Sequence, residues 1–297
     1  MKKIELVLWF RCNCRCRFCV VDAATARQSM STEDAVRHLK LSRGQGAEAV
    51  DFGGGEPTLR PDLPKLAAAA LRLGYACVGV KSNGLRLCYP EYVSELLAAG
   101  IRRFAVPVWG HVPSVHDSFS QVPGSFEMME MGLKHVLDLG GAAEADVLLT
   151  NATVPHLTDL VGHFADIGVR SFQFWLYSLF GSAGRLAEEL PTLTAAGAAV
   201  RRTAAAFSKR GLALSTTHLP PCFLGREHGL YRSIASEDLA IITPGGSFPA
   251  QESPFEAGVK TSRCRGCASY GSCAGARPEY LERFGPAEIS ARRRAKR

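Results

Sequence analysis

The chain has 297 residues, of which 46% are hydrophobic and 21% charged, and its formal net charge is +7. Five of the basic residues fall within positions 291–297, so the rest of the chain is nearly neutral and lacks the broad basic face of nucleic-acid-binding proteins. No segment reaches the roughly 18 apolar residues that cross a bilayer, and Glu5 interrupts the apolar run where a signal peptide would lie. We therefore expect a cytoplasmic protein with no membrane or nucleic-acid partner, in which ten cysteines indicate metal or redox chemistry.

Strand-like and helix-like segments alternate along the first two-thirds of the chain. The predicted strands are short, apolar and bounded by turn residues: Ile4–Phe10, Glu48–Phe52, Ala76–Lys81, Arg103–Trp109, Glu144–Leu149 and Ser171–Tyr177. The predicted helices are Thr32–Arg43, Asp62–Leu73, Glu91–Ala99, Ser125–Leu139, His156–Ile167 and Thr194–Arg210. Six successive βα units predict an α/β fold with a parallel sheet, either a curved partial barrel or an open doubly wound sheet. Both place ligands at the C-terminal ends of the strands.

The alternation stops after about Leu212. Residues 215–285 are rich in Pro, Gly and Cys and contain only short strand candidates such as Leu239–Ile242. Such a segment cannot easily build its own hydrophobic core, and a bound metal group would supply the missing stability. We predict a core domain at 1–214, a small Cys-rich domain at 215–285 and a basic, solvated C-terminal tail at 286–297.

Four cysteines follow the first predicted strand within eight residues. Cys12, Cys16 and Cys19 have C-x-x-x-C-x-x-C spacing, and three thiolates on one loop can hold three irons of a 4Fe–4S cluster. The fourth iron is then open to an added ligand. Zinc sites usually use two close Cys pairs and fit this spacing poorly. Cys14 fits no triad of that spacing, and we expect it to face away.

Two further motifs follow the second and third predicted strands. Gly53, Gly54 and Gly55 allow close approach of the backbone to a ligand, and the next residue, Glu56, offers a carboxylate to a ligand ammonium. Ser82 and Asn83 end the third strand in what is otherwise an ordinary turn. All three motifs fall at the C-terminal ends of strands and are expected to meet at one mouth of the fold.

A second cysteine group lies near the C-terminus. Cys264, Cys267 and Cys273 form a C-x-x-C-x-x-x-x-x-C array, and Cys222 supplies a fourth thiol from earlier in the chain. Four thiolates can hold a fully ligated 4Fe–4S cluster or a structural zinc ion, and the Cys-only ligand set favours the cluster.

The first cysteine triad, with Asn13 after its first Cys and Phe18 before its last, resembles the signature of the radical S-adenosylmethionine (SAM) superfamily. The resemblance implies a partial (βα)6 TIM-like barrel and one SAM-binding 4Fe–4S cluster. It implies that the Gly-Gly-Gly-Glu segment binds the methionine amino group of SAM and that Ser82 and Asn83 lie near its ribose or carboxylate. The second cysteine group resembles an auxiliary-cluster domain of the Twitch or reduced SPASM type.

The fourth predicted strand departs from that pattern. The superfamily often has Ser or Asp near the end of this strand, whereas this chain has Pro107 and Trp109, which leaves the fourth-strand contact with SAM unassigned. Trp109 and Trp175 are candidates to line the cavity. Weaker catalytic candidates, as hydrogen-atom or proton donors, are Cys77, Cys88, His111 and His116.

The resemblance implies an enzyme of the oxidoreductase or isomerase type. With a flavodoxin- or ferredoxin-type reductant it would cleave SAM to a deoxyadenosyl radical that abstracts a hydrogen atom from its substrate. Because only eleven residues precede Cys12, we expect no leader-peptide recognition domain, which favours a small natural-product-type metabolite (sugar, aminocyclitol or nucleoside) undergoing oxidation, epimerisation or rearrangement. The alternatives are a peptide maturase that cross-links or epimerises, and a non-catalytic iron–sulfur electron carrier.

Overall fold

A single sheet forms the centre of the protein. The computed structural model describes residues 2–179, 186–234, 237–253 and 256–291. The strand order is β7-β6-β5-β4-β3-β2-β1-β8-β9, and every neighbouring pair is parallel except β8 and β9. The six predicted strands are confirmed as the first six of this set: β1 Lys3–Trp9, β2 Ala49–Gly54, β3 Cys77–Lys81, β4 Arg103–Val108, β5 Ala142–Leu149, β6 Ser171–Leu176, β7 Ala213–Thr217, β8 Leu239–Thr243 and β9 Gly246–Pro249.

Helices follow the strands as the alternation predicts. Their bounds are α1 Thr32–Gly44, α2 Leu63–Arg72, α3 Pro90–Ala98, α4 Pro113–Ser120, α5 Ser125–Asp138, α6 Leu157–Ile167, α7 Leu193–Ala206 and α8 Pro278–Phe284. The predicted N-cap of α1 is confirmed, since the Ser31 side chain accepts a hydrogen bond from the Asp34 N–H at 3.0 Å. The short helices α4 and α8 were not predicted. Within the described ranges, the helices are all too short or too polar to span a membrane.

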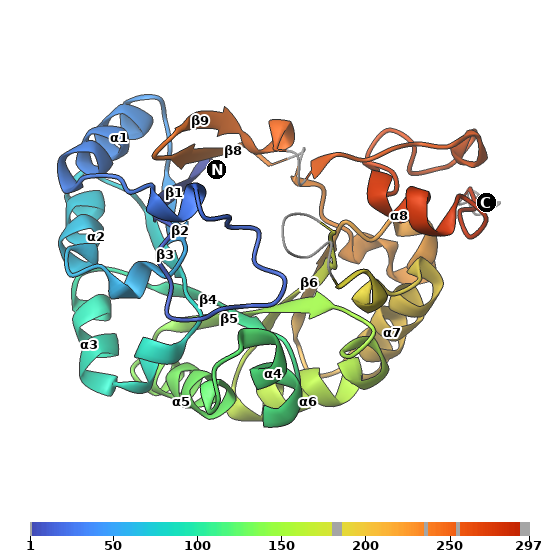
Figure 1. Cartoon of the computed structure of the whole chain (residues 1–297), viewed down its shortest axis with the longest axis horizontal. Coiled ribbons are helices and arrows are strands. Elements are labelled where there is room, and N and C mark those ends of the chain that lie inside the picture. Colours follow the sequence, from blue (N-terminus) through green and yellow to red (C-terminus); the bar gives the residue numbers. More distant parts are fainter. Residues whose placement is uncertain (1, 180–185, 235–236, 254–255, 292–297) are drawn as a thin grey trace.

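The sheet curves into a partial barrel with helices on its outer side (Figure 1). Along β6, Phe172 and Phe174 are fully buried among the helices, whereas Gln173 and Trp175 point into the barrel. The apolar core therefore lies between sheet and helices, and the inner face of the sheet is polar. This alternation is expected of strands with one apolar and one polar face.

The region predicted as a separate domain contributes to the same sheet. The predicted boundary after residue 214 falls inside β7, which pairs with β6, while β8 pairs with β1 at the opposite side of the barrel. Beyond β9 the chain forms short helical turns and α8. In the predicted tail, Ile289 is buried and Glu288 accepts hydrogen bonds from Thr194 at the start of α7, so residues 286–291 pack against the body. The basic positions from 292 lie outside the described residues.

Candidate active site

The thiol loop, residues 11–21 after β1, is held over the C-terminal mouth of the barrel. The backbone N–H groups of Arg15 and Arg17 donate to the carbonyls of Ser120 and Phe119, at 3.1 and 3.0 Å, at the end of α4. Cys12 is exposed, and Cys16 and Cys19 are half-buried. Three predicted cluster ligands thus lie on one loop that main-chain hydrogen bonds fix to a helix.

The prediction that Cys14 faces away is wrong. Its thiol is buried, accepts a hydrogen bond from Asn83 Nδ2 at 3.4 Å, and shares hydrogen bonds with the thiols of Cys12 and Cys16. The Cys14 N–H in turn points to Cys12 Sγ at 3.4 Å, because the loop folds back on itself within two residues. The Cys12 contact lowers the pKa of Cys14, but the Cys16 contact and burial together raise it to about 12.

Glu56 connects the ends of β2 and β3 through a fully buried carboxylate. Its oxygens accept hydrogen bonds from the Thr58 N–H and hydroxyl at 3.0 and 2.5 Å, from the Ser82 hydroxyl at 2.8 Å and from the Asn83 N–H at 2.7 Å. Burial raises the pKa of Glu56, and these four donors oppose that rise. The carboxylate predicted to meet a ligand ammonium is thus enclosed by donors of its own chain, and that contact stays a prediction.

The predicted close approach at the glycines is made by the chain's own backbone. A Cβ on Gly54, whose φ is +121°, would lie 2.2 Å from the Trp9 carbonyl oxygen, and one on Gly55 would lie 2.3 Å from that of Arg11. The N–H groups of Gly55 and Glu56 donate to those same two carbonyls at 2.8 and 2.7 Å. The glycines therefore let the end of β2 pack directly against the start of the thiol loop.

Asn83 joins the third motif to the first. Its Nδ2 donates to Asn13 Oδ1 at 2.8 Å and lies 3.6 Å from Cys12 Sγ, while its Oδ1 accepts from the Leu85 N–H at 3.0 Å. The three predicted motifs therefore meet at one mouth of the barrel, as their positions at strand ends predict.

An aromatic cavity of about 320 Å³, here called the upper cavity, adjoins the thiol loop. Phe18 of the loop contacts Trp109 and Tyr177 with ring centroids 5.2 and 6.3 Å apart. The predicted cavity residues Trp109 and Trp175 both line it, as do Pro107, Leu148 and Ser178. The remaining lining residues include three polar side chains that sequence reasoning missed: Asp146, His218 and Glu256.

His218 and Glu256 form a fixed pair at this cavity. His218 Nε2 lies 3.0 Å from Glu256 Oε1, and the His218 ring packs edge-on to Trp175 at 5.7 Å. The backbone of His218 has a φ of +67°, which lies in the left-handed region that few residues other than glycine adopt.

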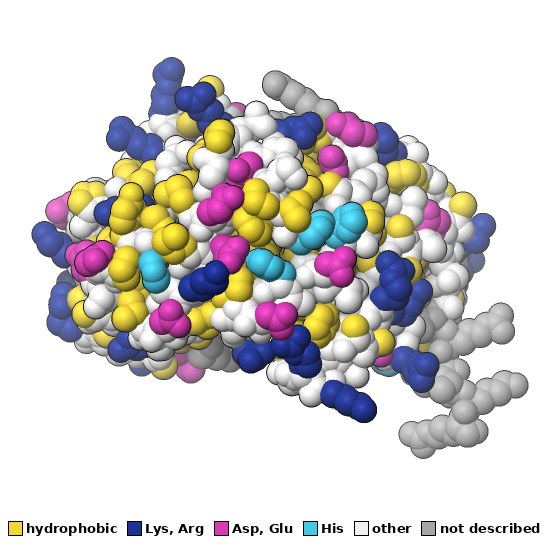
Figure 2. Space-filling model, turned by 90° about the horizontal axis from the view of Figure 1, so that it is seen from below, with side chains coloured by type: hydrophobic (Ala, Val, Ile, Leu, Met, Phe, Trp, Pro, Cys, Tyr) yellow, Lys and Arg dark blue, Asp and Glu magenta, His cyan; other side chains and the backbone are white. Residues whose placement is uncertain are grey.

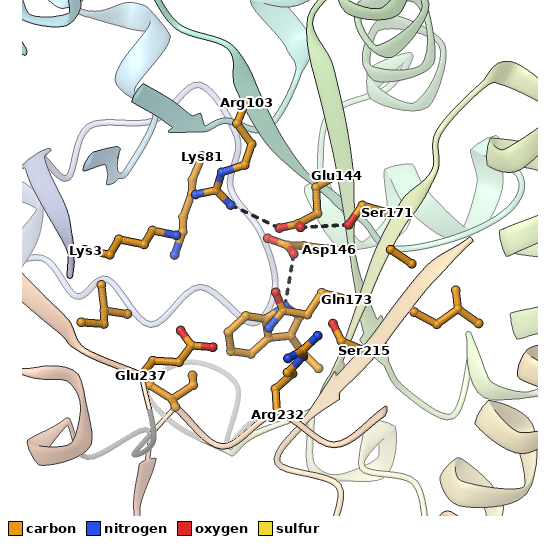
Figure 3. A pocket seen from close by; sticks show the side chains of 15 residues that line it. Lys3, Lys81, Arg103, Glu144, Asp146, Ser171, Gln173, Ser215, Arg232 and Glu237 are labelled. Carbon is orange, nitrogen blue, oxygen red and sulfur yellow. Dashed lines mark hydrogen bonds and ion pairs between the residues drawn. The ribbon is translucent and has the colours of Figure 1, made fainter. Parts of the chain in front are cut away.

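A second, charged cavity of about 300 Å³, the lower cavity, lies toward the N-terminal ends of the strands, and Figure 3 shows the side chains that line it. Glu144 and Asp146 point into it from β5; the Ser171 hydroxyl donates to Glu144 at 3.0 Å, and the Trp175 indole N–H donates to Asp146 at 3.3 Å. Burial, followed by the charge of Glu144, raises the pKa of Asp146 to about 7. Asp146 and Trp175 line both cavities.

The two candidate histidines lie apart from these cavities. His116 is buried on α4, stacks on Trp109 at 4.9 Å, and accepts the Trp109 N–H at Nδ1 at 3.3 Å. His111 stacks on His156 at 4.5 Å. Several histidines are exposed on the face of the molecule that Figure 2 shows. Neither His111 nor His116 is among the described residues that line either cavity.

We expect His116 to make the stability of the protein depend on pH. Burial lowers its pKa to about 4 from 6.5, against the opposing charge of Asp117, so unfolding takes up a proton between these values. The free energy of unfolding should therefore fall as pH drops from 6.5 to 4, by up to about 3 kcal/mol. Urea unfolding of wild type and His116→Phe at pH 7 and 4.5 measures this. An equal loss of stability in both proteins would contradict the assignment.

The second cysteine group comes together at one place. Cys222, Cys264, Cys267 and Cys273 all line one cavity. Burial raises the pKa of Cys222 to about 11, and the nearby Cys273 and Cys267 add to the rise. Across the described ranges, no three His, Cys, Asp or Glu side chains converge closely enough for one metal ion. Cys222 thus lies at the same cavity as the later three cysteines, and that the four share a bound metal group stays a prediction.

The two remaining cysteines are separate from the thiol loop. Cys77 begins β3, and Cys88 ends a short helical turn, Leu85–Cys88, beyond that strand. Both are half-buried, and neither is among the described residues that line the upper cavity.

The sequence of this chain is similar to a family model and to curated enzymes. A model of the family described as the radical SAM superfamily matches residues 6–166. An "AdoMet-dependent heme synthase" of Oleidesulfovibrio alaskensis is 27% identical over 183 residues, which are 61% of this chain and 47% of that protein. A "Probable GTP 3',8-cyclase" of Saccharolobus solfataricus is 30% identical over 143 residues, 47% of this chain and 45% of that protein. The chain thus spans about half the length of these curated relatives.

Solved structures show the same fold. Streptococcus suis SuiB bound to S-adenosylmethionine matches with a TM-score of 0.71 and 17% identity, over 99% of this chain and 77% of that one. SuiB bound to its precursor peptide SuiA matches with a TM-score of 0.70 and 15% identity, over 99% and 75% of the two chains. At such low identity the likeness concerns the fold alone.

Proposed function

This chain belongs to the radical SAM superfamily, whose members are enzymes, and on that premise we propose that it takes a hydrogen atom from a small natural-product-type metabolite. The fold of this superfamily binds SAM and one 4Fe–4S cluster. When bound, these groups supply a deoxyadenosyl radical after one-electron reduction. The electron-carrier alternative is not retained, because the family and the relatives named above are catalytic.

The observation that carries the proposal is the thiol loop at the mouth of the barrel. Cys12, Cys16 and Cys19 offer three thiolates for four irons, so one iron is left for an added ligand. The loop is fixed by main-chain bonds to α4 and by Asn83, which suits a site that must hold a reactive ligand in one orientation.

The residues proposed to hold SAM surround that loop. Gly53 and Gly54 end β2 and Gly55 lies against the start of the thiol loop, while Ser82 and Asn83 directly follow β3. Glu56 contributes by fixing both strand ends through its four accepted hydrogen bonds. We assign to its carboxylate the role of ordering the loops that surround SAM.

A negatively charged reductant fits the exposed side of the loop. Arg11, Arg15 and Arg17 alternate with the thiols and are exposed. Positive charge around a redox centre steers an acidic partner to it, and flavodoxins and ferredoxins are the proposed class.

Cys222, Cys264, Cys267 and Cys273 are proposed to hold a second, fully ligated 4Fe–4S cluster in an auxiliary domain of the Twitch or reduced SPASM type. Their arrangement around one cavity supports this. A structural zinc ion is the alternative. In the oxidoreductase case, the second cluster would accept an electron from the substrate.

A peptide substrate is the second candidate. SuiB, whose fold this chain shares, is described in complex with a precursor peptide. The size of the upper cavity, about 320 Å³, is within the range of small-molecule sites and favours the metabolite.

Iron counting with product analysis tests the proposal. After anaerobic reconstitution, we expect about eight irons per wild-type chain and about four in a Cys264→Ala/Cys267→Ala variant, as two 4Fe–4S clusters require. Wild type with dithionite and SAM should release deoxyadenosine. Four irons in both proteins would assign zinc or no metal to the C-terminal thiols, and wild type that holds iron without forming deoxyadenosine would contradict the proposed chemistry.

A further inference from the structure

The two cavities inside the barrel differ in chemistry and meet at two side chains. The upper cavity adjoins the thiol loop and is walled by Phe18, Trp109 and Tyr177. The lower cavity is lined mainly by charged and polar groups (Figure 3). Asp146 and Trp175 belong to both, so the carboxyl group of Asp146 forms the boundary between an aromatic space and a charged one.

The ionisable side chains of the upper cavity favour a cation. The described residues that line it include Asp146, Glu256 and His218, and none is Lys or Arg. Glu256 already has His218 as a partner at 3.0 Å. From the described residues Asp146 accepts one long hydrogen bond, from Trp175 at 3.3 Å, and it is the carboxyl group left for a ligand.

Burial and Glu144 raise the pKa of Asp146 more than Lys81 and Arg103 lower it, and the direct partners of these two cations are other carboxylates. Lys81 Nζ lies 2.6 Å from Glu5, and Arg103 binds Asp51 with its guanidinium group. In this part of the interior three cations face four carboxyl groups: Lys3, Lys81 and Arg103 against Glu5, Asp51, Glu144 and Asp146. Arg232 and Glu237, which also line the lower cavity, leave that balance unchanged.

An ammonium group is the ligand that fits this arrangement. Aromatic faces attract a cation through their ring quadrupoles, and a carboxylate pairs with it by a charge-assisted hydrogen bond. A neutral hydroxyl group would gain less at the same place and would leave the excess carboxyl group without a counter-charge.

We propose that the upper cavity binds a small metabolite bearing an ammonium group, with Asp146 as the residue that receives it and Trp175 as the aromatic face beside it. This rests on the proposed function, and it selects amine-bearing substrates, such as aminocyclitols and amino sugars, over neutral sugars. Asp146 is a specificity-determining residue in this assignment. Glu256, oriented by His218, completes the acidic lining of the same cavity.

Calorimetric titration of the reconstituted, SAM-loaded protein tests this with a matched pair of probes. Cyclohexylamine, an ammonium ion at pH 8, and cyclohexanol differ in that one group. We expect the amine to bind at least about tenfold tighter in wild type. Asp146→Asn should abolish this preference. Glu144→Gln should keep it, because it removes a carboxylate of the lower cavity whose charge raises the pKa of Asp146, and so leaves Asp146 ionised.

Several results would overturn the assignment. If wild type binds the amine and the alcohol equally well, or binds neither, the upper cavity has no cation site, and no variant is needed to show this. A folded Asp146→Asn protein that keeps the preference would exclude Asp146. If the reconstituted protein binds the amine without SAM but not when loaded with SAM, the cavity belongs to SAM. Tighter binding of Nα-acetyl-lysine amide than of cyclohexylamine, about tenfold or more, would indicate a peptide side chain instead.

The test of amine binding is independent of the test of radical SAM chemistry. Deoxyadenosine release by wild type tests radical SAM chemistry without any amine, and the titration tests the cavity without SAM cleavage. A protein that forms deoxyadenosine but shows no preference for the amine would refute the substrate class alone.

Discussion

Replacing Cys16 with Ala should reduce deoxyadenosine formation at least about a hundredfold and remove the iron bound at the thiol loop. Two thiolates are too few to hold a cluster that leaves one iron open. Cys14→Ala is the matched control, because Cys14 lies within hydrogen-bond distance of Cys12 and Cys16 and is also close to Asn83. If the C-x-x-x-C-x-x-C spacing decides which thiols bind iron, the Cys14→Ala variant should bind as much iron and form as much deoxyadenosine as wild type.

The comparison is informative because the two thiols are neighbours in space. Removal of the buried Cys14 thiol should cost about 1 kcal/mol of stability from lost packing, too little to unfold the loop. Iron content and deoxyadenosine yield, measured on both variants after identical reconstitution, decide the matter. Loss of iron in Cys14→Ala with retention in Cys16→Ala would mean that the structure, and not the spacing, identifies the ligands.

Glu56→Gln should lower the free energy of unfolding by about 2–4 kcal/mol and weaken SAM binding at least about tenfold. The wild-type carboxylate accepts four hydrogen bonds in a fully buried position, and the amide that replaces one oxygen is itself a donor. At least one of the four donors would lose its acceptor, and the loops after β2 and β3 would loosen.

Urea unfolding and equilibrium binding of SAM measure the two effects. Glu95→Gln, on the exposed side of α3, makes the same chemical change where no buried network is disturbed and should alter neither quantity. If Glu56→Gln lowers the free energy of unfolding as expected but leaves SAM binding unchanged, then Glu56 stabilises the fold and has no part in SAM binding.

The motifs at the mouth could be predicted because each is contiguous in sequence. The thiol triad, the glycine run before Glu56 and the Ser82–Asn83 turn all follow predicted strands, and parallel strands bring such segments to one edge. Contact details could not be predicted in the same way. The burial of Cys14 and the enclosure of Glu56 depend on which backbone groups the neighbouring loops present.

Asp146 illustrates what the sequence leaves open. Alternating Glu144 and Asp146 in a strand is typical of any polar face, and only the curvature of the sheet makes that face an interior. Burial and the neighbouring Glu144 raise the pKa of Asp146, whereas groups from three other strands lower it. His218 and Glu256 are 38 residues apart and gave no local signal, and β7 was missed because its sequence, Ala-Leu-Ser-Thr-Thr, is half polar.

The pairing of β1 with β8 has a consequence for how the chain acquires its fold. Lys3 lies opposite Leu239, so the strand that leads into the thiol loop has one neighbour nearby in sequence and the other more than 230 residues away. Contacts of such long sequence separation form late, because the closure of a long loop costs entropy before any contact compensates it. During synthesis one side of β1 therefore remains an unpaired edge until almost the whole barrel has left the ribosome.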